Sequence, residues 1–294
     1  MAVRVGLVGA GGRAREVYAP ALAACSDVDF AAVWARSADA VRPLADRHGV
    51  TACEGFDELV ERCEAVVFAV PPAAQEEYAA RAARRHRALL LEKPIGADIA
   101  GAEELTATAL RERVPTTVAL PWHYTTDVQR FLDQDVPAAE PVGGTGRLLT
   151  NSHAQGSPTP AWRRARGVLR DQAADLLDLL EAALGPIAGL HARGQPRGGW
   201  VGLLIDHQVG RFSEASIFTG RLHGPDVAVV EVNGPRGTAE VEALGGLGPE
   251  AYERMVAEFA RSVTGAQPHR FDIRHGLHLQ RLVEAAETDL VLHG

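Results

Sequence analysis

Cysteine is scarce in this chain of 294 residues. The only three, Cys25, Cys53 and Cys63, are odd in number and show no C-x-x-C spacing. A disulfide-stapled secreted protein would need paired cysteines, and a cysteine-based zinc site would need clustered ones. We therefore expect reduced thiols in a cytoplasmic protein.

Long apolar runs are also missing, since none reaches the length that crosses a bilayer. The first residues, MAVRVGLVGAGG, enter a strand-like run at once and lack the pattern of a signal peptide. A net charge of −8 and a pI near 5.8 argue against nucleic acid or an anionic membrane as a partner. No G-x-S-x-G motif supports nucleophilic hydrolysis. We expect a soluble protein with a small-molecule substrate.

The first 120 residues alternate short apolar runs with stretches of helical period. This alternation predicts a doubly wound parallel sheet with helices on both faces. After Pro121, successive strands with turn residues and no helical spacers predict an open, largely antiparallel sheet. The fold class is therefore α/β, with domains over residues 1–120 and 121–294, and the last helix is free to pack back on the first domain. The predicted second-domain strands are 147–153, 187–193, 200–207, 215–220, 227–232 and 238–243, after a predicted loop, PAAEPVGGTG, over 137–146.

A glycine loop follows the first predicted strand. Gly9, Gly11 and Ala14 form a G-x-G-x-x-A pattern that opens a helix in a βαβ context. Gly9 permits the tight turn, Gly11 lets the backbone approach a pyrophosphate, and Ala14 allows close helix packing. The pattern predicts a dinucleotide site that also includes Gly12 and Arg13.

The end of the second strand bears on which dinucleotide binds. An NAD site favours an acid here, on the ribose 2′-hydroxyl, but this chain has Ala35, Arg36 and Ser37. A guanidinium and a hydroxyl suit a 2′-phosphate, so NADP(H) is favoured over NAD(H). In the alternative interpretation, Arg36 only stacks on the adenine.

The chain resembles the Gfo/Idh/MocA family, the relatives of glucose–fructose oxidoreductase and inositol dehydrogenase. The resemblance covers nearly the whole length and rests on five features. These are the glycine loop, VFAVPP (67–72), EKP (92–94), Trp162-Arg163 with LRDQAADLLDLLEAALGPI (169–187), and the C-terminal segment from FARSVTG onward.

The resemblance implies a Rossmann domain followed by an α/β domain that joins copies into a homodimer or homotetramer through its sheet. It also implies hydride transfer between a nicotinamide and a carbon bearing oxygen, often on a sugar or cyclitol. Lys93 would be the catalytic lysine, which donates to the reacting oxygen and stabilises its developing charge. The cofactor would also contact Val70, Pro71, Pro72, Glu92 and Pro94.

The predicted helix GVLRDQAADLLDLL (167–180) departs from the family. Relatives usually carry an Asp and, four residues later, a His that acts as general acid or base. Here Asp171 fills the first position, Asp175 replaces the His, and Asp178 matches a later Asp. An exposed Asp has a pKa of about 3.9 and is a poor proton donor at neutral pH.

Several roles for Asp175 stay open. Apolar surroundings and Asp171 could raise its pKa, or it could pair with Lys93 or hold a cationic imine substrate. Proton transfer could also come from elsewhere. We therefore interpret Asp171 and Asp175 as catalytic together with Lys93, and name as tentative substrate contacts His123, Tyr124, His153 and Trp162.

Two alternatives to a sugar-type NADP-dependent oxidoreductase remain. One is an imine reductase on the same fold, and the other is a non-catalytic NADP(H)-binding sensor or partner protein that lost its chemistry with the His. No metal site is predicted, because the helical pair His275 and His278 lacks a cluster of further ligands. The PxxxH pattern common after VFAVPP ends here in Gln75.

Overall fold

The computed structural model describes residues 2–154, 159–164, 167–195, 199–265 and 268–293. The chain forms two compact units, each discontinuous in sequence. The first comprises residues 1–121 and 248–278, and the second comprises residues 122–247 and 279–294. Two helices contribute residues to both units, namely η2 (Pro121–Tyr124) and α11 (Ile273–His293).

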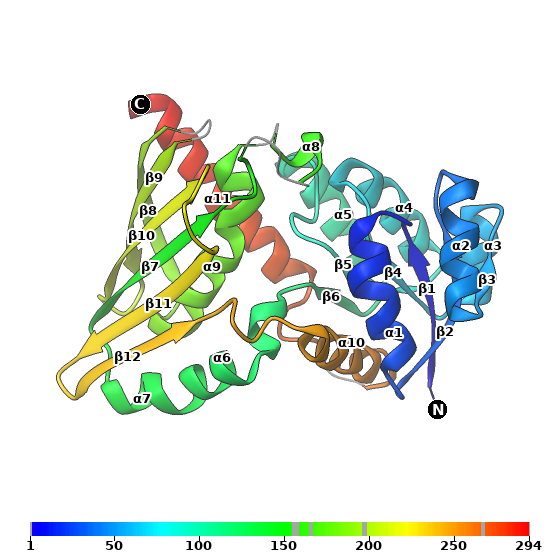
Figure 1. The fold of residues 1–294 in the computed structure, drawn as a ribbon, viewed down its shortest axis with the longest axis horizontal. Coiled ribbons are helices and arrows are strands. Elements are labelled where there is room, and N and C mark those ends of the chain that lie inside the picture. The colour runs from blue at the N-terminus through cyan, green and yellow to red at the C-terminus, as the bar shows by residue number, and fades with distance from the viewer. Residues whose placement is uncertain (1, 155–158, 165–166, 196–198, 266–267, 294) are drawn as a thin grey trace. The chain divides into compact units, whose positions relative to one another are not determined.

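A parallel six-stranded sheet organises the first unit (Figure 1). Its strand order, β3-β2-β1-β4-β5-β6, is that of a dinucleotide-binding Rossmann fold. The strands are β1 (Val3–Val8), β2 (Val28–Trp34), β3 (Thr51–Ala52), β4 (Ala65–Phe68), β5 (Ala88–Leu91) and β6 (Thr116–Val118). The helices are η1 (Ala14–Tyr18), α1 (Ala19–Ala24), α2 (Ala38–His48), α3 (Phe56–Arg62), α4 (Pro72–Arg84), α5 (Ile99–Arg111) and α10 (Pro249–Thr264).

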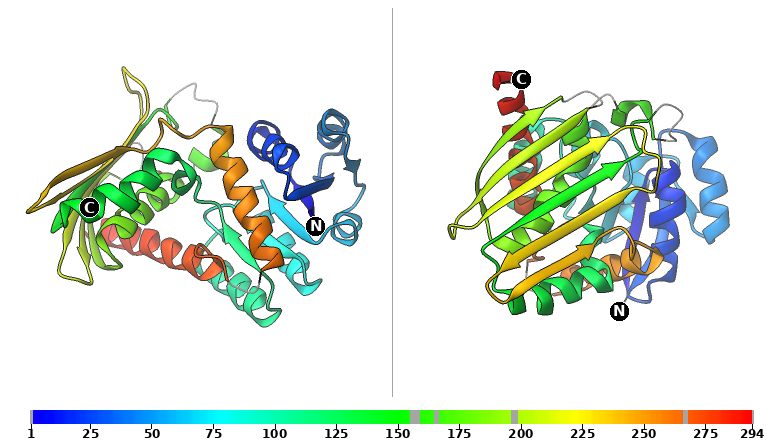
Figure 2. Two further views of the ribbon diagram at one scale, coloured as in Figure 1. Left: turned by 90° about the horizontal axis from the view of Figure 1, so that it is seen from below. Right: turned by 60° about the vertical axis from the view of Figure 1, so that its left-hand side comes forward.

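Both faces of this sheet are covered by helices. Helix α1 contacts both α2 and α10 on one face, whereas α3, α4 and α5 lie on the other (Figure 2). Because both faces are covered, the central strands β1, β4 and β5 are apolar and almost completely buried. On the α3–α4 side, the rings of Trp34, Phe56 and Tyr78 pack edge to face or tilted with centroids 4.8–5.5 Å apart.

The second unit is built on a mixed sheet of order β12-β11-β7-β10-β9-β8. Among the described strands of this second sheet, β7 and β10 pair in parallel and all other neighbours pair antiparallel. The strands are β7 (Gly143–Thr150), β8 (Ile187–Gly194), β9 (Trp200–His207), β10 (Phe212–Thr219), β11 (Val227–Gly234) and β12 (Gly237–Glu242). The helices are α6 (Thr126–Arg130), η3 (Phe131–Asp135), α7 (Val136–Ala139), α8 (Ala161–Arg164) and α9 (Val168–Leu184). The two sheets confirm the predicted α/β class.

Helix α9 covers one face of the second sheet and forms its core. Leu176 and Leu180 are completely buried, and both approach β7 at Gly146, where an added Cβ would lie 3.0 Å from each side chain. The prediction of a loop over 137–146 is wrong at both ends of that segment. Val136–Ala139 is helical, and Gly143–Gly146 begins β7, because glycine here allows close packing of helix on strand.

Other differences from the predicted elements are small or local. The segment 126–135, for which no helix was predicted, is helical. Strand β7 ends at Thr150 and not at His153, so His153 lies in the following turn. Within the described part of the chain, no helix has both the length and the apolar character required to cross a membrane.

Candidate active site

The glycine loop after β1 has the backbone geometry that a dinucleotide requires. Gly9 has a φ of +122°, and a Cβ there would lie 2.4 Å from the carbonyl oxygen of Ala69, so only glycine fits. At Gly11 an added Cβ would meet nothing within 4 Å, which leaves the loop surface open. Helical residues begin at Gly12, and their free N–H groups attract phosphate. The loop therefore fits the pyrophosphate of a dinucleotide.

The residues proposed to select the dinucleotide follow β2, which ends at Trp34. Arg36 and Ser37 are both exposed. Ser37 is the N-cap residue of α2, yet its hydroxyl accepts no hydrogen bond from that helix. Both side chains are therefore exposed at the surface just beyond the second strand.

Lys93 lies on an irregular segment that follows β5, and the Lys93–Pro94 peptide bond is cis. Its neighbour Glu92 turns back toward the glycine loop, where its carboxylate accepts hydrogen bonds from the Arg13 guanidinium and, at 2.6 Å, from the Tyr18 hydroxyl. Strand β4 lies between β1 and β5, so the Arg13–Glu92 pair crosses the carboxyl end of β4. That end leads directly into Val70, Pro71 and Pro72.

Glu92 remains a carboxylate despite its burial. Burial by itself would raise the pKa of Glu92, but the charges of Arg13 and Lys93 and the hydrogen bonds from Tyr18 and Arg13 outweigh it, so the pKa falls below its ordinary value. The same contact, with Glu92 as the main cause, raises the pKa of Arg13 well above its usual range. Burial, followed by the Glu92 charge, raises the pKa of Tyr18 well above its usual range. Glu92 is thus a fixed negative charge between the two loops.

Lys93 is the only lysine of the chain, beside 29 arginines. Arginine cannot lose its proton in a protein, whereas lysine can, so the two are not interchangeable in proton transfer. The basic residues of this chain are therefore arginine everywhere except at the position where acid–base chemistry is predicted. This signal is present in the sequence, and the motif-based interpretation did not use it.

Helix α9 of the second unit holds Asp171 firmly. One carboxylate oxygen accepts from Arg163 Nε at 2.6 Å, and the other bonds His153 Nε2 at 3.1 Å and Gln172 Nε2 at 2.6 Å. The carboxylate is only 4% exposed, and the His153 ring is 7% exposed. His153 and Asp171 were both predicted site residues, and the fold of the second unit brings them together. Sequence reasoning did not assign Arg163 or Gln172 to the site.

Asp178 belongs to a different contact, about two turns further along α9 than Asp171. Its carboxylate lies 2.5 Å from His123 Nε2, and both side chains are 3% exposed. The predicted substrate contact His123 is thus placed against a buried acid, and the neighbouring Tyr124 is 1% exposed. Asp175 lies between the two contacts and is half-buried. The side chain of Trp162 lies outside the described residues.

The predicted site residues therefore form two groups. Arg13, Glu92 and Lys93 share the first unit with the other predicted cofactor contacts. Asp171 and Asp175 belong to the second unit together with His123 and His153. The first group combines the glycine loop, the ionised carboxylate of Glu92 that Arg13 binds, and the amine of Lys93. The second has a carboxylate held by three donors next to a half-buried one.

Comparison with known proteins identifies a family that the first 120 residues match. Residues 3–120 match the model GFO_IDH_MocA, described as an oxidoreductase family with an NAD-binding Rossmann fold. The first unit is therefore a Rossmann domain of the kind that this oxidoreductase family carries. Over residues 3–120 the chain matches the Gfo/Idh/MocA family, in agreement with the resemblance.

Two curated relatives each match a little over a third of the chain. The dTDP-3,4-didehydro-2,6-dideoxy-α-D-glucose 3-reductase of Streptomyces violaceoruber is 36% identical over 114 residues, which is 38% of this chain and 33% of that protein. The glucose-6-phosphate 3-dehydrogenase of Bacillus subtilis is 27% identical over 121 residues, 41% of this chain and 34% of that protein. The match spans about a third of the length of either relative.

Solved structures share the fold over nearly the whole chain. GenD2 from gentamicin A biosynthesis, in complex with NAD, has a TM-score of 0.87 at 21% identity and covers 99% of this chain and 94% of its own. The scyllo-inositol dehydrogenase of Lactobacillus casei, with NAD(H) and scyllo-inositol, has a TM-score of 0.84 at 15% identity, with 99% and 98% coverage. These likenesses establish a common architecture for both units.

The buried carboxylate of Glu92 yields a pH-dependent prediction. Glu92→Gln leaves Arg13 without its charged partner and should lower the unfolding free energy at neutral pH by about 1–3 kcal/mol. Because the folded pKa of Glu92 is depressed, its contribution is complete above the unfolded pKa of about 4.3 and is lost as pH falls through the folded pKa. The difference between the two proteins should therefore shrink below about pH 4.

Urea denaturation at several pH values, followed by circular dichroism, measures this difference. Glu61→Gln, at an exposed position of α3, is the matched control and should leave stability unchanged. A loss of stability in Glu92→Gln that stays constant down to pH values well under 4 would contradict an ionised Glu92.

Proposed function

We propose that this protein is an NADP-dependent oxidoreductase that transfers a hydride between the nicotinamide and a carbonyl or alcohol carbon of a sugar-like substrate. The observation that carries the proposal is the single lysine of the chain, placed directly after β5 and next to an ionised glutamate that is bound to the glycine loop. The names of both curated relatives support a hexose-type substrate that reacts at carbon 3. A small biosynthetic carbonyl compound is the broader form of the same proposal.

Lys93 acts on the oxygen of the reacting carbon. Its ammonium donates a hydrogen bond to that oxygen and stabilises the negative charge that grows there during reduction, and in the reverse direction its amine accepts the hydroxyl proton. When bound, the nicotinamide supplies or accepts the hydride. Glu92 keeps a fixed negative charge beside the amine. Asp171 and Asp175 orient the substrate hydroxyls and exchange protons with them.

A second function is favoured by one observation, the carboxylate of Asp175 where relatives carry a histidine. A carboxylate stabilises an iminium cation better than an imidazole does, so an imine reductase is the alternative. Asp175→His distinguishes the two, because it should improve carbonyl reduction but damage imine reduction. A sensor that binds NADP(H) without chemistry would turn over neither kind of substrate.

Lys93→Met tests the mechanism. The variant should bind NADPH normally and lose turnover by roughly 10²- to 10⁴-fold, because general acid–base catalysis typically contributes that much. The assay follows nicotinamide absorbance with a panel of hexoses, hexose phosphates, nucleotide-linked sugars and inositols. Lys93→Arg keeps the positive charge and should also be inactive in proton transfer. Full activity of Lys93→Met on a panel member that the unaltered protein turns over would refute the mechanism.

Arg36→Ala tests the preference for NADP. Loss of one charge-assisted hydrogen bond to the 2′-phosphate should weaken NADPH binding by roughly tenfold and leave NADH binding unchanged. Titration of the cofactor's fluorescence gives both dissociation constants. Arg42→Ala, at an exposed position of α2, is the control. Equal weakening for NADPH and NADH would show instead that Arg36 stacks on the adenine.

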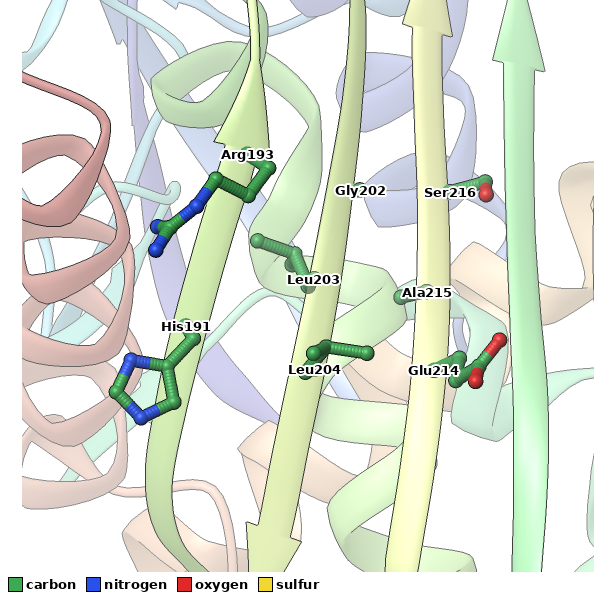
Figure 3. A pocket seen from close by; sticks show the side chains of 8 residues that line it. All are labelled: His191, Arg193, Gly202, Leu203, Leu204, Glu214, Ala215 and Ser216. Atoms are coloured by element: carbon green, nitrogen blue, oxygen red, sulfur yellow. The ribbon is translucent and has the colours of Figure 1, made fainter. Parts of the chain in front are cut away.

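The second sheet is the proposed contact between copies of the chain, in a homodimer or homotetramer. Its face opposite α9 carries a shallow hollow of about 570 Å³ on β8, β9 and β10. Figure 3 shows the lining side chains of His191, Arg193, Leu203, Leu204, Glu214, Ala215 and Ser216, with Gly202. Leu204 is 49% exposed, and Trp200 and Phe212 on the same sheet are also exposed. Exposed apolar side chains gathered on one sheet face are typical of association surfaces.

Leu204→Glu tests this contact. A carboxylate in the centre of the face should shift the molar mass, measured by light scattering after size exclusion, toward the monomer. Leu110→Glu, on exposed α5 in the other unit, should leave the mass unchanged. An unaltered mass in Leu204→Glu would place the contact elsewhere. A cytoplasmic location and the absence of nucleic-acid and membrane partners stay predictions of the sequence.

A further inference from the structure

The segment that carries Lys93 has no regular secondary structure. Residues 92–98 form neither helix nor strand, between the end of β5 and the start of α5. Backbone N–H and C=O groups that are buried outside helices and sheets need other partners. The position of Lys93 therefore depends on whatever side chains bind this backbone.

Gln75, in the first turn of α4, provides those partners at one end of the segment. Its amide nitrogen donates to the carbonyl oxygens of Glu92 at 2.8 Å, Ile95 at 3.2 Å and Pro94 at 3.3 Å. Its amide oxygen accepts from the backbone N–H of Glu92 at 2.8 Å. The side chain is completely buried. The amide thus binds the backbone of Glu92 before Lys93 through both its oxygen and its nitrogen. Its nitrogen also binds the backbone of Pro94 and Ile95 after Lys93.

Glu76, the next residue of α4, holds the other end of the segment. Its carboxylate accepts a hydrogen bond from the backbone N–H of Ala97. Gly96 and Gly101 pack closely against the same carboxylate. A Cβ added at Gly96 would lie 2.7 Å from its oxygen Oε1, and one added at Gly101 would lie 2.1 Å from it. Two adjacent side chains of α4 therefore bind the backbone from Glu92 to Ala97. The same helix begins at Pro72, in the segment predicted to contact the nicotinamide.

We propose that Gln75 is a positioning residue for Lys93. The backbone at Glu92 presents an N–H and a carbonyl to the same side chain, so the side chain must accept and donate at once. A carboxylate cannot donate unless it is protonated, and an aliphatic side chain can do neither, whereas an amide does both at every pH. Gln75 fixes the backbone on both sides of Lys93, and thereby the place from which its amine reaches the substrate.

This inference rests on the proposed role of Lys93, but its test needs no substrate. Because Lys93 is the only lysine, amine-specific reagents report on it and on the terminal amino group alone. Reductive methylation with limiting formaldehyde, followed by peptide mass spectrometry, gives the labelling rate of Lys93 relative to the terminal amine in the same molecule. The folded state of each variant is checked by circular dichroism.

Gln75→Leu has nearly the same volume and removes all four hydrogen bonds. Gln75→Asn keeps the amide but is one methylene shorter, and it serves where the leucine variant fails to fold. Either folded variant should label Lys93 several-fold faster than the unaltered protein, because its backbone is no longer fixed. Ser262→Ala, which removes a side-chain hydrogen bond to Phe259 in α10 of the same unit, is the control and should leave the rate unchanged. An unchanged or slower rate in both Gln75 variants overturns the proposal.

A kinetic measurement separates this proposal from the proposed function. With any substrate found in the screen, the Gln75 variants should show a roughly 10- to 100-fold lower kcat at similar NADPH affinity, since a displacement of about 1 Å costs that much. Failure of Lys93→Met to lose activity refutes the proposed function and leaves the labelling result intact. Unchanged labelling refutes the role of Gln75 and leaves the proposed function intact.

Discussion

The first unit depends on one buried charge. The Glu92 carboxylate lies in a place that would favour its neutral form, and it stays ionised because Arg13 and Tyr18 donate to it. Arg13 and Tyr18 belong to the helical segment that opens directly after the glycine loop, whereas Glu92 begins the irregular segment after β5 that carries Lys93. A buried charge without partners is very costly, so the two segments are fixed relative to each other. The Arg13–Glu92 ion pair therefore connects the predicted dinucleotide site to the segment that carries the predicted catalytic amine.

The second unit handles its acids differently. Three aspartates lie within two turns of α9, and the fold gives them separate surroundings. Asp178 is buried against His123, whereas Asp171 is bound by Arg163, His153 and Gln172. Like charges that share a helix face repel each other, and cationic or donor side chains from other segments offset this repulsion. The aspartate stripe thus belongs to two distinct contacts, with Asp175 between them.

The sequence predicts the local parts of this structure well. Strand β9 has the predicted bounds, because the alternation of apolar and polar residues expresses burial directly. The glycine loop is equally local, since Gly9 needs a positive φ whatever surrounds it. The sequence predicts no helix over 126–135 and a loop where β7 begins, whereas the structure has helical residues and a strand there. Glycine is normally unfavourable within a strand, and only the packing of α9 against Gly146 explains it there.

By itself, the sequence determined the α/β class, the Rossmann order of elements, the glycine loop and the resemblance to the Gfo/Idh/MocA family, because these follow from periodicity and short motifs. Only the tertiary structure decided which distant residues meet. Arg13 and Glu92 are 79 positions apart, His123 and Asp178 are 55 apart, and residues 248–278 join the first unit. No periodicity links such positions, since their contact results from how strands and helices are ordered in space. The partners of Glu92, Asp171 and Asp178 are therefore properties of the fold.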